Sequence, residues 1–173
     1  GLYQILVNFN FHSMENSIFK CGELPEFEKL TPEKISHDFP LVLEKITKDF
    51  QNIEKFLSKY SKESKLDWDK VINPLNEVNE VLRWSWGVIS HLNAVKNSKS
   101  LREIYSRFLP DIIGLSNKFG QSKIIYGALV KLKATNNFDQ IKNRILDKEI
   151  LEMKHRGISL NENDQITFNT ISC

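Results

Sequence analysis

The stretch VINPLNEVNEVLRWSWGVI, Val71–Ile89, decides the fold that this sequence predicts. Its apolar residues recur every three or four positions, which places them on one face of a helix at about 100° per residue. These residues are Val71, Leu75, Val78, Leu82, Trp86 and Ile89. The spacing predicts a long helix that contributes this face to a hydrophobic core.

A second apolar face begins near residue 81 of the same helix. It consists of Val81, Trp84, Val88 and Val95. Because Trp84 and Trp86 are two residues apart, they point to opposite sides of the helix. A helix that is apolar on two faces is usually buried between layers, and Gly87 would let another backbone come close. We therefore expect a central helix, one face of which meets a part of the protein outside this chain.

Another helix is predicted from Thr31 onward. Thr31 is a preferred N-cap residue, and Pro32 suits the first helical position. Pro40 is expected to kink or restart the helix, because proline lacks the backbone donor. An apolar stripe follows at spacings of three and four, formed by Phe39, Leu43, Ile46, Phe50, Ile53, Leu57 and Tyr60.

The remaining helices lie downstream. Ser100 and Glu103 fit a capping box for a third helix, which is expected to kink at Pro110 and to end at Gly120. A short helix over 124–132 follows. The last predicted helix carries Phe138, Ile141, Ile145, Leu146, Ile150 and Met153, with Gly157 at its C′ position. Strand alternation is not convincing anywhere, so the predicted fold is all-α, an antiparallel helical bundle with short loops.

Composition narrows the function classes. The chain has 173 residues, of which 40% are hydrophobic and 27% charged, as in an ordinary globular domain. With 24 basic and 22 acidic residues, it lacks the basic excess of a nucleic-acid binder. The sequence contains no run of 18 apolar residues, so we expect no membrane span. Cys21 and Cys173 have neither disulfide-framework density nor metal spacing, which indicates a reducing, intracellular setting, cytoplasmic or organellar.

The two ends of the sequence are unusual. Residues 1–22 are expected to be extended or disordered, and Met14 is the expected natural start, with 1–13 an extension. Residues 23–173 are expected to form one helical domain. A new helical pattern begins at Asn161, and the sequence stops at Cys173 within it. We therefore expect this domain to be incomplete at its C-terminus.

The histidines do not form a zinc-protease motif. Such a protease needs H-E-x-x-H, which brings two imidazoles to one metal and a glutamate to the attacking water. None of His12, His37, His91 and His155 is followed by Glu, and no two are four residues apart. The sequence therefore predicts no catalytic, metal-binding or cofactor-binding residue.

Other polar residues have structural interpretations. His91 is expected to be a hydrogen-bonded structural histidine, since a general base also needs a positioned partner. Asn93 and Asn97 are expected to bond exposed carbonyls near the helix end. Glu77 and Glu80 are interpreted as exposed helix positions and not as an acid–base pair.

A family resemblance rests on ordered matches along most of the chain. The densest is the run Ser90–Ser98, SHLNAVKNS, followed by Leu101-Arg102-Glu103, Tyr105 and Leu109-Pro110. The other matches are Glu23-Leu24-Pro25-Glu26-Phe27, Leu30, Pro32, Glu33, Trp68, Pro74-Leu75-Asn76-Glu77-Val78, Val81-Leu82, Gly157-Ile158 and Leu160. In this order, the sequence resembles the N-terminal part of the oligopeptidase A and thimet oligopeptidase family of zinc metallopeptidases.

The resemblance implies a function for the parent protein. Members of the family are helical enzymes that hydrolyse short peptides inside a deep channel, with zinc as cofactor. This chain would be the non-catalytic N-terminal segment that helps to form the channel, packs against the catalytic domain and binds no zinc itself. The metal motif would lie downstream, so no catalytic residue maps onto a position here.

An alternative function starts from the residues alone. The two-faced helix around Trp84 and Trp86 would also suit a stand-alone, non-catalytic helical module that binds another protein. A purified chain that is monomeric and exposes little apolar surface would need no missing partner.

Overall fold

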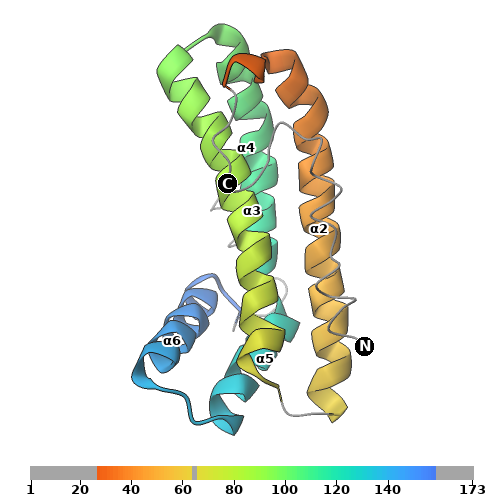
Figure 1. Cartoon of the computed structure of the whole chain (residues 1–173), viewed down its shortest axis with the longest axis vertical. Helices are drawn as coiled ribbons and strands as arrows, with labels where there is room; N and C mark the ends of the chain where they lie inside the picture. The colour runs from red at the N-terminus through yellow and green to blue at the C-terminus, as the bar shows by residue number, and fades with distance from the viewer. Residues whose placement is uncertain (1–26, 64–65, 159–173) are drawn as a thin grey trace. The chain divides into compact units, whose positions relative to one another are not determined.

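The all-α prediction is confirmed. A computed structural model describes residues 27–63 and 66–158, and these contain helices and no strands. A short 3₁₀ helix, η2 (Phe27–Lys29), is followed by five α-helices: α2 (Pro32–Glu63), α3 (Trp68–Lys96), α4 (Lys99–Gly120), α5 (Lys123–Thr135) and α6 (Gln140–His155). Figure 1 shows the five α-helices with their labels.

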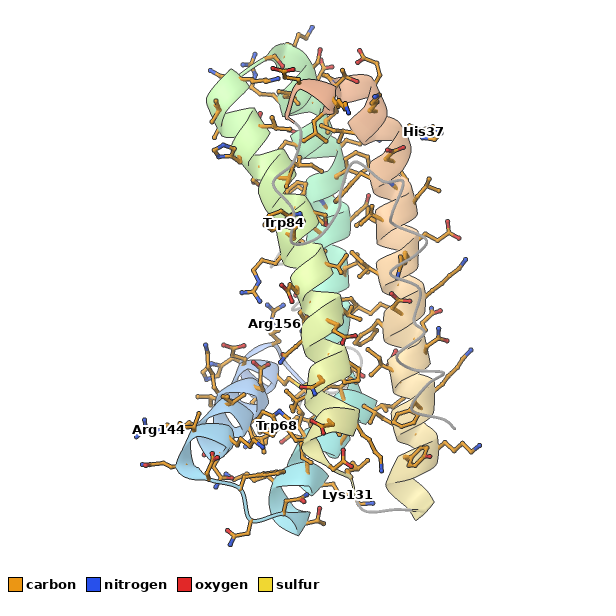
Figure 2. The ribbon with its side chains drawn as sticks, viewed as in Figure 1. His37, Trp68, Trp84, Lys131, Arg144 and Arg156 are labelled. Atoms are coloured by element: carbon orange, nitrogen blue, oxygen red, sulfur yellow. The ribbon has the colours of Figure 1, made fainter. Side chains whose placement is uncertain are left out.

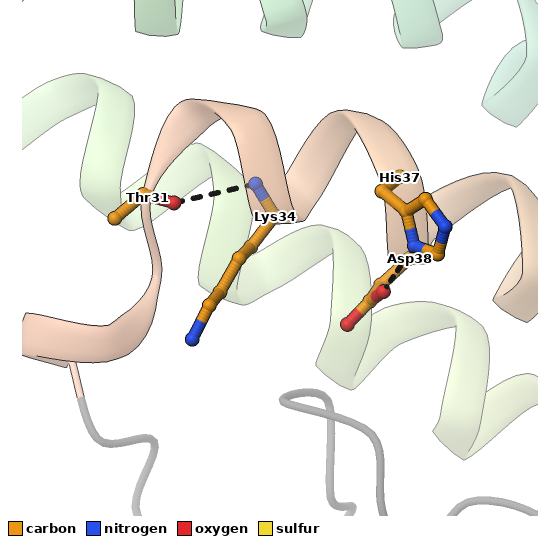
Figure 3. A network of polar contacts seen from close by, with 4 residues as sticks. All are labelled: Thr31, Lys34, His37 and Asp38. Atoms are coloured by element: carbon orange, nitrogen blue, oxygen red, sulfur yellow. Dashed lines mark hydrogen bonds and ion pairs between the residues drawn. The ribbon is translucent and has the colours of Figure 1, made fainter.

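Helix starts and ends follow local chemistry. Thr31 caps α2, since its Oγ1 accepts a hydrogen bond of 3.3 Å from the backbone N–H of Lys34 (Figure 3). Asp67 caps α3 in the same way, through a 2.8 Å bond from the N–H of Lys70. At the end of α6, Gly157 has a φ of 87°. The N–H of Ile158 bonds to the carbonyl of Met153, which completes the predicted glycine C-cap.

The local expectations at the two prolines, at Ser100 and at Gly87 have different outcomes. The helices α2 and α4 run through Pro40 and Pro110 without a break, so Pro40 does not restart its helix, and the kinks stay predictions. Ser100 does not cap α4: the helix begins at Lys99, and the hydroxyl of Ser98 accepts the N–H of Leu101 at 3.2 Å. Among the described residues, a Cβ placed at Gly87 would have nothing within 4 Å, so the space there is open and the close approach of another backbone stays a prediction.

The described residues divide into two compact units, and α2, α3 and α4 each contribute a segment to both. The first unit consists of 27–49 and 77–109. The second consists of 50–63, 66–76 and 110–158. Within the first unit, the successive helical segments run in opposite directions, as expected for helices joined by short loops (Figure 1).

Phe39 lies at the centre of the first unit. Its ring is fully buried and lies 4.9 Å from the ring of Phe108 and 6.1 Å from that of Trp86, measured between centroids. Trp86 in turn stacks on Tyr105 at 4.8 Å. The aliphatic core around these rings consists of Leu30, Ile35, Val42, Ile46, Val78, Leu82, Val88, Ile89, Leu92, Leu101 and Ile104. Edge and stacked contacts of this kind stabilise aromatic pairs beyond their burial.

The second face of α3 is only partly buried. Val88 is buried, whereas Val95 is 67% exposed. Trp84 is half-buried, and its indole Nε1 is buried without a hydrogen-bond acceptor among the described residues. The expectation of a helix apolar on two faces is therefore correct for its composition, but the end of the second face is open.

The second unit has a core drawn from all five helices. Phe50 of α2 stacks on Phe119 of α4 at 4.1 Å. The buried residues around this pair are Ile53, Leu57, Leu66, Val71, Ile72, Ile112, Ile125, Ala128, Leu129, Leu132, Leu146, Met153 and Ile158. The expected stripe of α6 is only partly correct, because Leu146 and Met153 are buried whereas Ile141 is 71% exposed.

Candidate functional site

The junction between α3 and α4 contains the end of the SHLNAVKNS run. Asn97 has a φ of 43°, a left-handed conformation that asparagine tolerates better than most residues. Nη1 of Arg102 donates to the backbone oxygen of Asn97 and to its Oδ1, both at 2.9 Å. Asn97 thus accepts from a guanidinium and does not itself bond helix-end carbonyls as expected. With the cap from Ser98, these side chains build a two-residue turn.

Two polar residues earlier in the run have different surroundings. His91 is exposed on α3. Asn93 is half-buried, and its Oδ1 is buried with no hydrogen-bond donor in the part of the chain that the structure describes. The expected bond from Asn93 to a helix-end carbonyl is not among the contacts of this residue. The structural interpretation of His91 stays a prediction.

The other histidines of the described region lie on the surface. His37 is 80% exposed, and its Nδ1 lies 2.8 Å from Oδ1 of the adjacent Asp38 (Figure 3). His155 is exposed in the last turn of α6. His12, Cys21 and Cys173 lie outside the described residues. Across 27–63 and 66–158, no three His, Cys, Asp or Glu side chains come together in a way that could hold a metal ion.

The carboxylates named from the sequence are exposed, whereas an unpredicted one contacts a buried serine. Glu77 and Glu80 are exposed on α3, as expected. Glu54 of α2 instead accepts a 2.8 Å hydrogen bond from the hydroxyl of Ser122, which is buried and caps α5. A serine directly before an apolar helical run is an N-cap signal. Nothing local in the sequence points to Glu54 as its partner.

An aromatic and cationic cluster fixes the start of α6 in the second unit. The rings of Trp68 and Phe138 meet edge to face with centroids 5.5 Å apart. Nζ of Lys142 lies 5.2 Å from the Trp68 centroid and 5.7 Å from the Phe138 centroid. Cation–π contacts at a surface contribute little stabilisation energy. We therefore interpret this cluster as a packing contact between the start of α3 and the start of α6. Figure 2 shows Trp68 at its place near the start of α3.

A second set of contacts between elements lies at the end of α5. Nδ2 of Asn136 donates to the backbone oxygen of Leu66 at 3.0 Å and to that of Leu132 at 2.9 Å. The same amide therefore closes the C-terminus of α5 and holds the segment before α3. Lys133 of α5 also pairs with Asp147 of α6. These polar contacts order the helices of the second unit but bring no reactive groups together.

Among the described residues, large hydrophobic side chains are exposed at seven positions, five of them on α5 and α6. They are Leu41, Val95, Ile124, Val130, Ile141, Ile145 and Leu151. Scattered exposed apolar residues are normal, whereas a concentration on neighbouring elements marks an interface. In the described part of the chain, no helix has a segment sufficiently long and apolar to cross a membrane.

Comparison with known proteins identifies the family. The family model described as the N-terminal domain of neurolysin/thimet oligopeptidase matches residues 40–165. Oligopeptidase A of Haemophilus influenzae is 34% identical over 163 residues, which cover 92% of this chain and 23% of that protein. Oligopeptidase A of Escherichia coli is 29% identical over 162 residues, 92% of this chain and 23% of that protein.

A plant relative shows the same proportions. The probable cytosolic oligopeptidase A of Arabidopsis thaliana is 24% identical over 159 residues, which cover 90% of this chain and 22% of that protein. The chain thus spans about a quarter of the length of the relatives that it matches. The resemblance found in the sequence is confirmed: this chain belongs to the family of neurolysin/thimet oligopeptidase N-terminal domains.

Proposed function

We propose that this chain is the non-catalytic N-terminal segment of a zinc-dependent oligopeptidase, which hydrolyses short peptides. The observation that carries the proposal is the family match over 40–165 combined with coverage of only 23% of the bacterial oligopeptidase A relatives. A segment of this extent contributes structure to a larger peptidase. By the same resemblance, it helps to form the wall of a substrate channel, and the parent acts in the cytoplasm or in an organelle.

The residues that the structure describes do not fit a zinc site. Catalytic zinc needs three protein ligands, usually histidines and a carboxylate, converging on one point. In the described ranges, His37, His91 and His155 are separate, and no group of three donors exists. We therefore assign zinc binding and every step of hydrolysis to a part of the parent outside this chain. The role left to the described helices is to support that part and to limit access to it.

The proposal is tested by comparing two proteins. The longer protein read from the gene should contain one zinc per chain and cleave short peptides, whereas the 173-residue chain should do neither. Metal analysis by mass spectrometry and cleavage of a quenched fluorescent peptide give the two readouts. A longer protein without H-E-x-x-H, or stoichiometric zinc on the 173-residue chain, would refute the proposal.

A stand-alone interaction module is the second candidate, favoured by the exposed apolar residues of α5 and α6. The two candidate functions predict different binding partners and different reading frames. A module of this kind would bind a separate protein without any peptidase in the same polypeptide. An open reading frame that ends soon after Cys173 would support it over the peptidase.

A further inference from the structure

Trp84 on α3 carries a buried hydrogen-bond donor that no described residue satisfies (Figure 2). Its indole Nε1 is buried, and no acceptor bonds to it within 27–63 and 66–158. Glu80, one turn earlier on α3, is exposed and does not accept this bond. Buried side-chain donors are normally hydrogen-bonded to protein or to ordered water. The acceptor for Trp84 is therefore expected from outside the described residues.

The side chains beside Trp84 on α3 are apolar. Val81 lies three residues before Trp84 and Val88 four residues after it, so the three share one face of the helix. Val88 is 7% exposed, and Val81 and Trp84 are half-buried. We call these three residues the Trp84 patch. A buried water needs about three polar partners, which two valines do not supply, so a backbone carbonyl is the acceptor that suits this patch.

The described chain begins in the first unit, close to the level of the end of α3. The rings of Phe39 and Trp86 lie 6.1 Å apart, and α2 and α3 run in opposite directions in this unit (Figure 1). Pro32, the first residue of α2, lies seven residues before Phe39. It is therefore level with a point about seven residues after Trp86, from which Trp84 is about 14 Å back along the helix axis.

Residues 18–26, which directly precede η2, are long enough to cover this distance. An extended chain advances about 3.3 Å per residue, so nine residues reach about 30 Å. The segment contains three large apolar residues, Ile18, Phe19 and Leu24. Pro25 favours an extended backbone at Leu24, and the carbonyls of an extended backbone are not used in helix hydrogen bonds. The segment can therefore supply both apolar cover and a carbonyl acceptor.

We propose that residues 18–26 lie across the Trp84 patch, and that one of their backbone carbonyls accepts the indole N–H of Trp84. This segment joins the described chain at Phe27, in the same unit as Trp84. The other end of the chain follows Ile158, which belongs to the second unit. The inference concerns the fold of this chain and does not depend on the proposed function.

Hydrogen exchange at the indole of Trp84 tests the inference in the full 173-residue chain. The indole N–H signals are followed by ¹⁵N NMR after transfer to heavy water, and Trp84→Phe identifies the signal of Trp84. We expect Phe19→Asp to speed exchange at Trp84 at least tenfold, because the introduced charge displaces the segment from the patch. Phe9→Asp, the same substitution outside the segment, is the matched control and should leave the rate unchanged.

A second variant and a second indole make the exchange result specific. Leu24→Asp should speed exchange at Trp84 as Phe19→Asp does, whereas exchange at Trp68, in the second unit, should not change. Unchanged exchange at Trp84 in both variants overturns the inference, as does an equal increase in Phe9→Asp. If Trp68 also exchanges faster, the variant is unfolded, and cross-linking decides.

Cross-linking identifies the occupant without changing the segment. Gly87→Cys, three residues after Trp84, introduces a thiol at a position with open space. We expect a short bismaleimide to link position 87 to Cys21, in the proposed segment, at least tenfold faster than to Cys173. Asn79→Cys, exposed on α3 about 140° around the helix from Trp84, is the matched control and should link to Cys21 at least tenfold more slowly.

The other possible occupants give different cross-links. Faster linking of position 87 to Cys173 overturns the inference, because the C-terminal end of the chain would then cover the patch. Links between two molecules overturn it as well, because the occupant would be a second copy. Equal linking of positions 79 and 87 to Cys21 shows that the segment does not prefer the Trp84 patch and also overturns it.

Discussion

The hydroxyl of Ser122 donates a 2.8 Å hydrogen bond to Oε2 of Glu54, 68 residues away in the sequence. The same Oγ accepts the backbone N–H of Ile125 at 3.3 Å, so it caps α5. Ser122 is only 7% exposed, which leaves little water to replace either bond. One hydroxyl therefore closes the N-terminus of α5 and ties that helix to α2 within the second unit.

Replacing Ser122 with alanine removes both bonds. Loss of an N-cap costs about 1 kcal/mol, and loss of a hydrogen bond to a charged group adds to it. We expect Ser122→Ala to lower the free energy of unfolding by about 2 kcal/mol, measured by urea denaturation. Glu54→Gln keeps an acceptor oxygen and should cost less. Ser106→Ala, at an exposed position of α4, is the control, and an equal loss in both alanine variants would contradict the role of Ser122.

The turn at Asn97 gives a second prediction. Asn97→Ala puts a residue with a Cβ but no side-chain acceptor into a left-handed conformation, which costs about 1 kcal/mol. Asn97→Gly accepts the same φ without strain and loses only the bond from Arg102 to Oδ1. We therefore expect urea denaturation to rank the three proteins as wild type, then Asn97→Gly, then Asn97→Ala. Alanine equal to or better than glycine would show that φ is not the decisive factor.

The fold was predictable where the signal is local. A 3.6-residue period repeats within one helix, so Phe39, Phe50 and Leu57 were placed correctly in the core. The same reasoning failed for Ile141, which is 71% exposed. Periodicity shows which residues share a face, but the neighbouring helices determine how much of that face they cover.

The residue that caps α4 depends on the turn just before the helix. Ser98 and Ser100 both precede the apolar run of α4, and either could be an N-cap by residue type. The left-handed Asn97 and its bonds from Arg102 end α3 at Lys96, so α4 starts early and Ser98 becomes the cap. Contacts between distant residues, such as Ser122 with Glu54, have no local signal at all. The run Ser90–Ser98 indicated the family correctly. Its last two residues, Asn97 and Ser98, form the turn between α3 and α4.

Gly120 and Arg156 give a prediction about coupling. A Cβ added at Gly120 would overlap the Cδ of Arg156. An alanine at position 120 and the arginine at position 156 would therefore compete for the same space. The end of α4 is also tied to Arg156 by a 2.6 Å bond from Nε2 of Gln121 to its backbone oxygen. Alanine is favoured over glycine in a helix by about 1 kcal/mol. We therefore expect Gly120→Ala to stabilise the Arg156→Ala variant but to give little gain in the wild type.

A double-mutant cycle measures this competition. Urea denaturation of the wild type, both single variants and the double variant gives the interaction energy directly, which we expect to be about 0.5–1 kcal/mol. Arg144→Ala replaces Arg156→Ala in the control cycle, since Arg144 is on the outside of α6 (Figure 2). An interaction energy near zero in the Arg156 cycle would mean that the arginine moves aside without cost.

The raised pKa of Glu149 leads us to expect that the stability of the fold depends on pH. Partial desolvation raises the pKa of its carboxyl above 4.5, and the charge of Glu152 raises it further, against a smaller opposing effect of Lys148. Between 4.5 and the raised pKa, the folded chain binds more protons than the unfolded chain, so stability falls as pH rises through that window. Above the window, ionised Glu149 opposes folding by a constant amount.

Removing the charge of Glu149 should therefore stabilise the chain at neutral pH. We expect Glu149→Gln to raise the free energy of unfolding at pH 7 by less than about 1 kcal/mol, because the side chain is only partly desolvated and solvent screens its charge. The gain should shrink as pH falls through 4.5, because the wild-type carboxyl then becomes protonated in the unfolded state as well as in the folded one. Glu80→Gln on α3 provides a control at another exposed position. The free energies of unfolding of the wild type and of Glu149→Gln are measured by urea denaturation between pH 4 and 7. If they differ by the same amount at every pH, ionisation of Glu149 is not the cause of the difference.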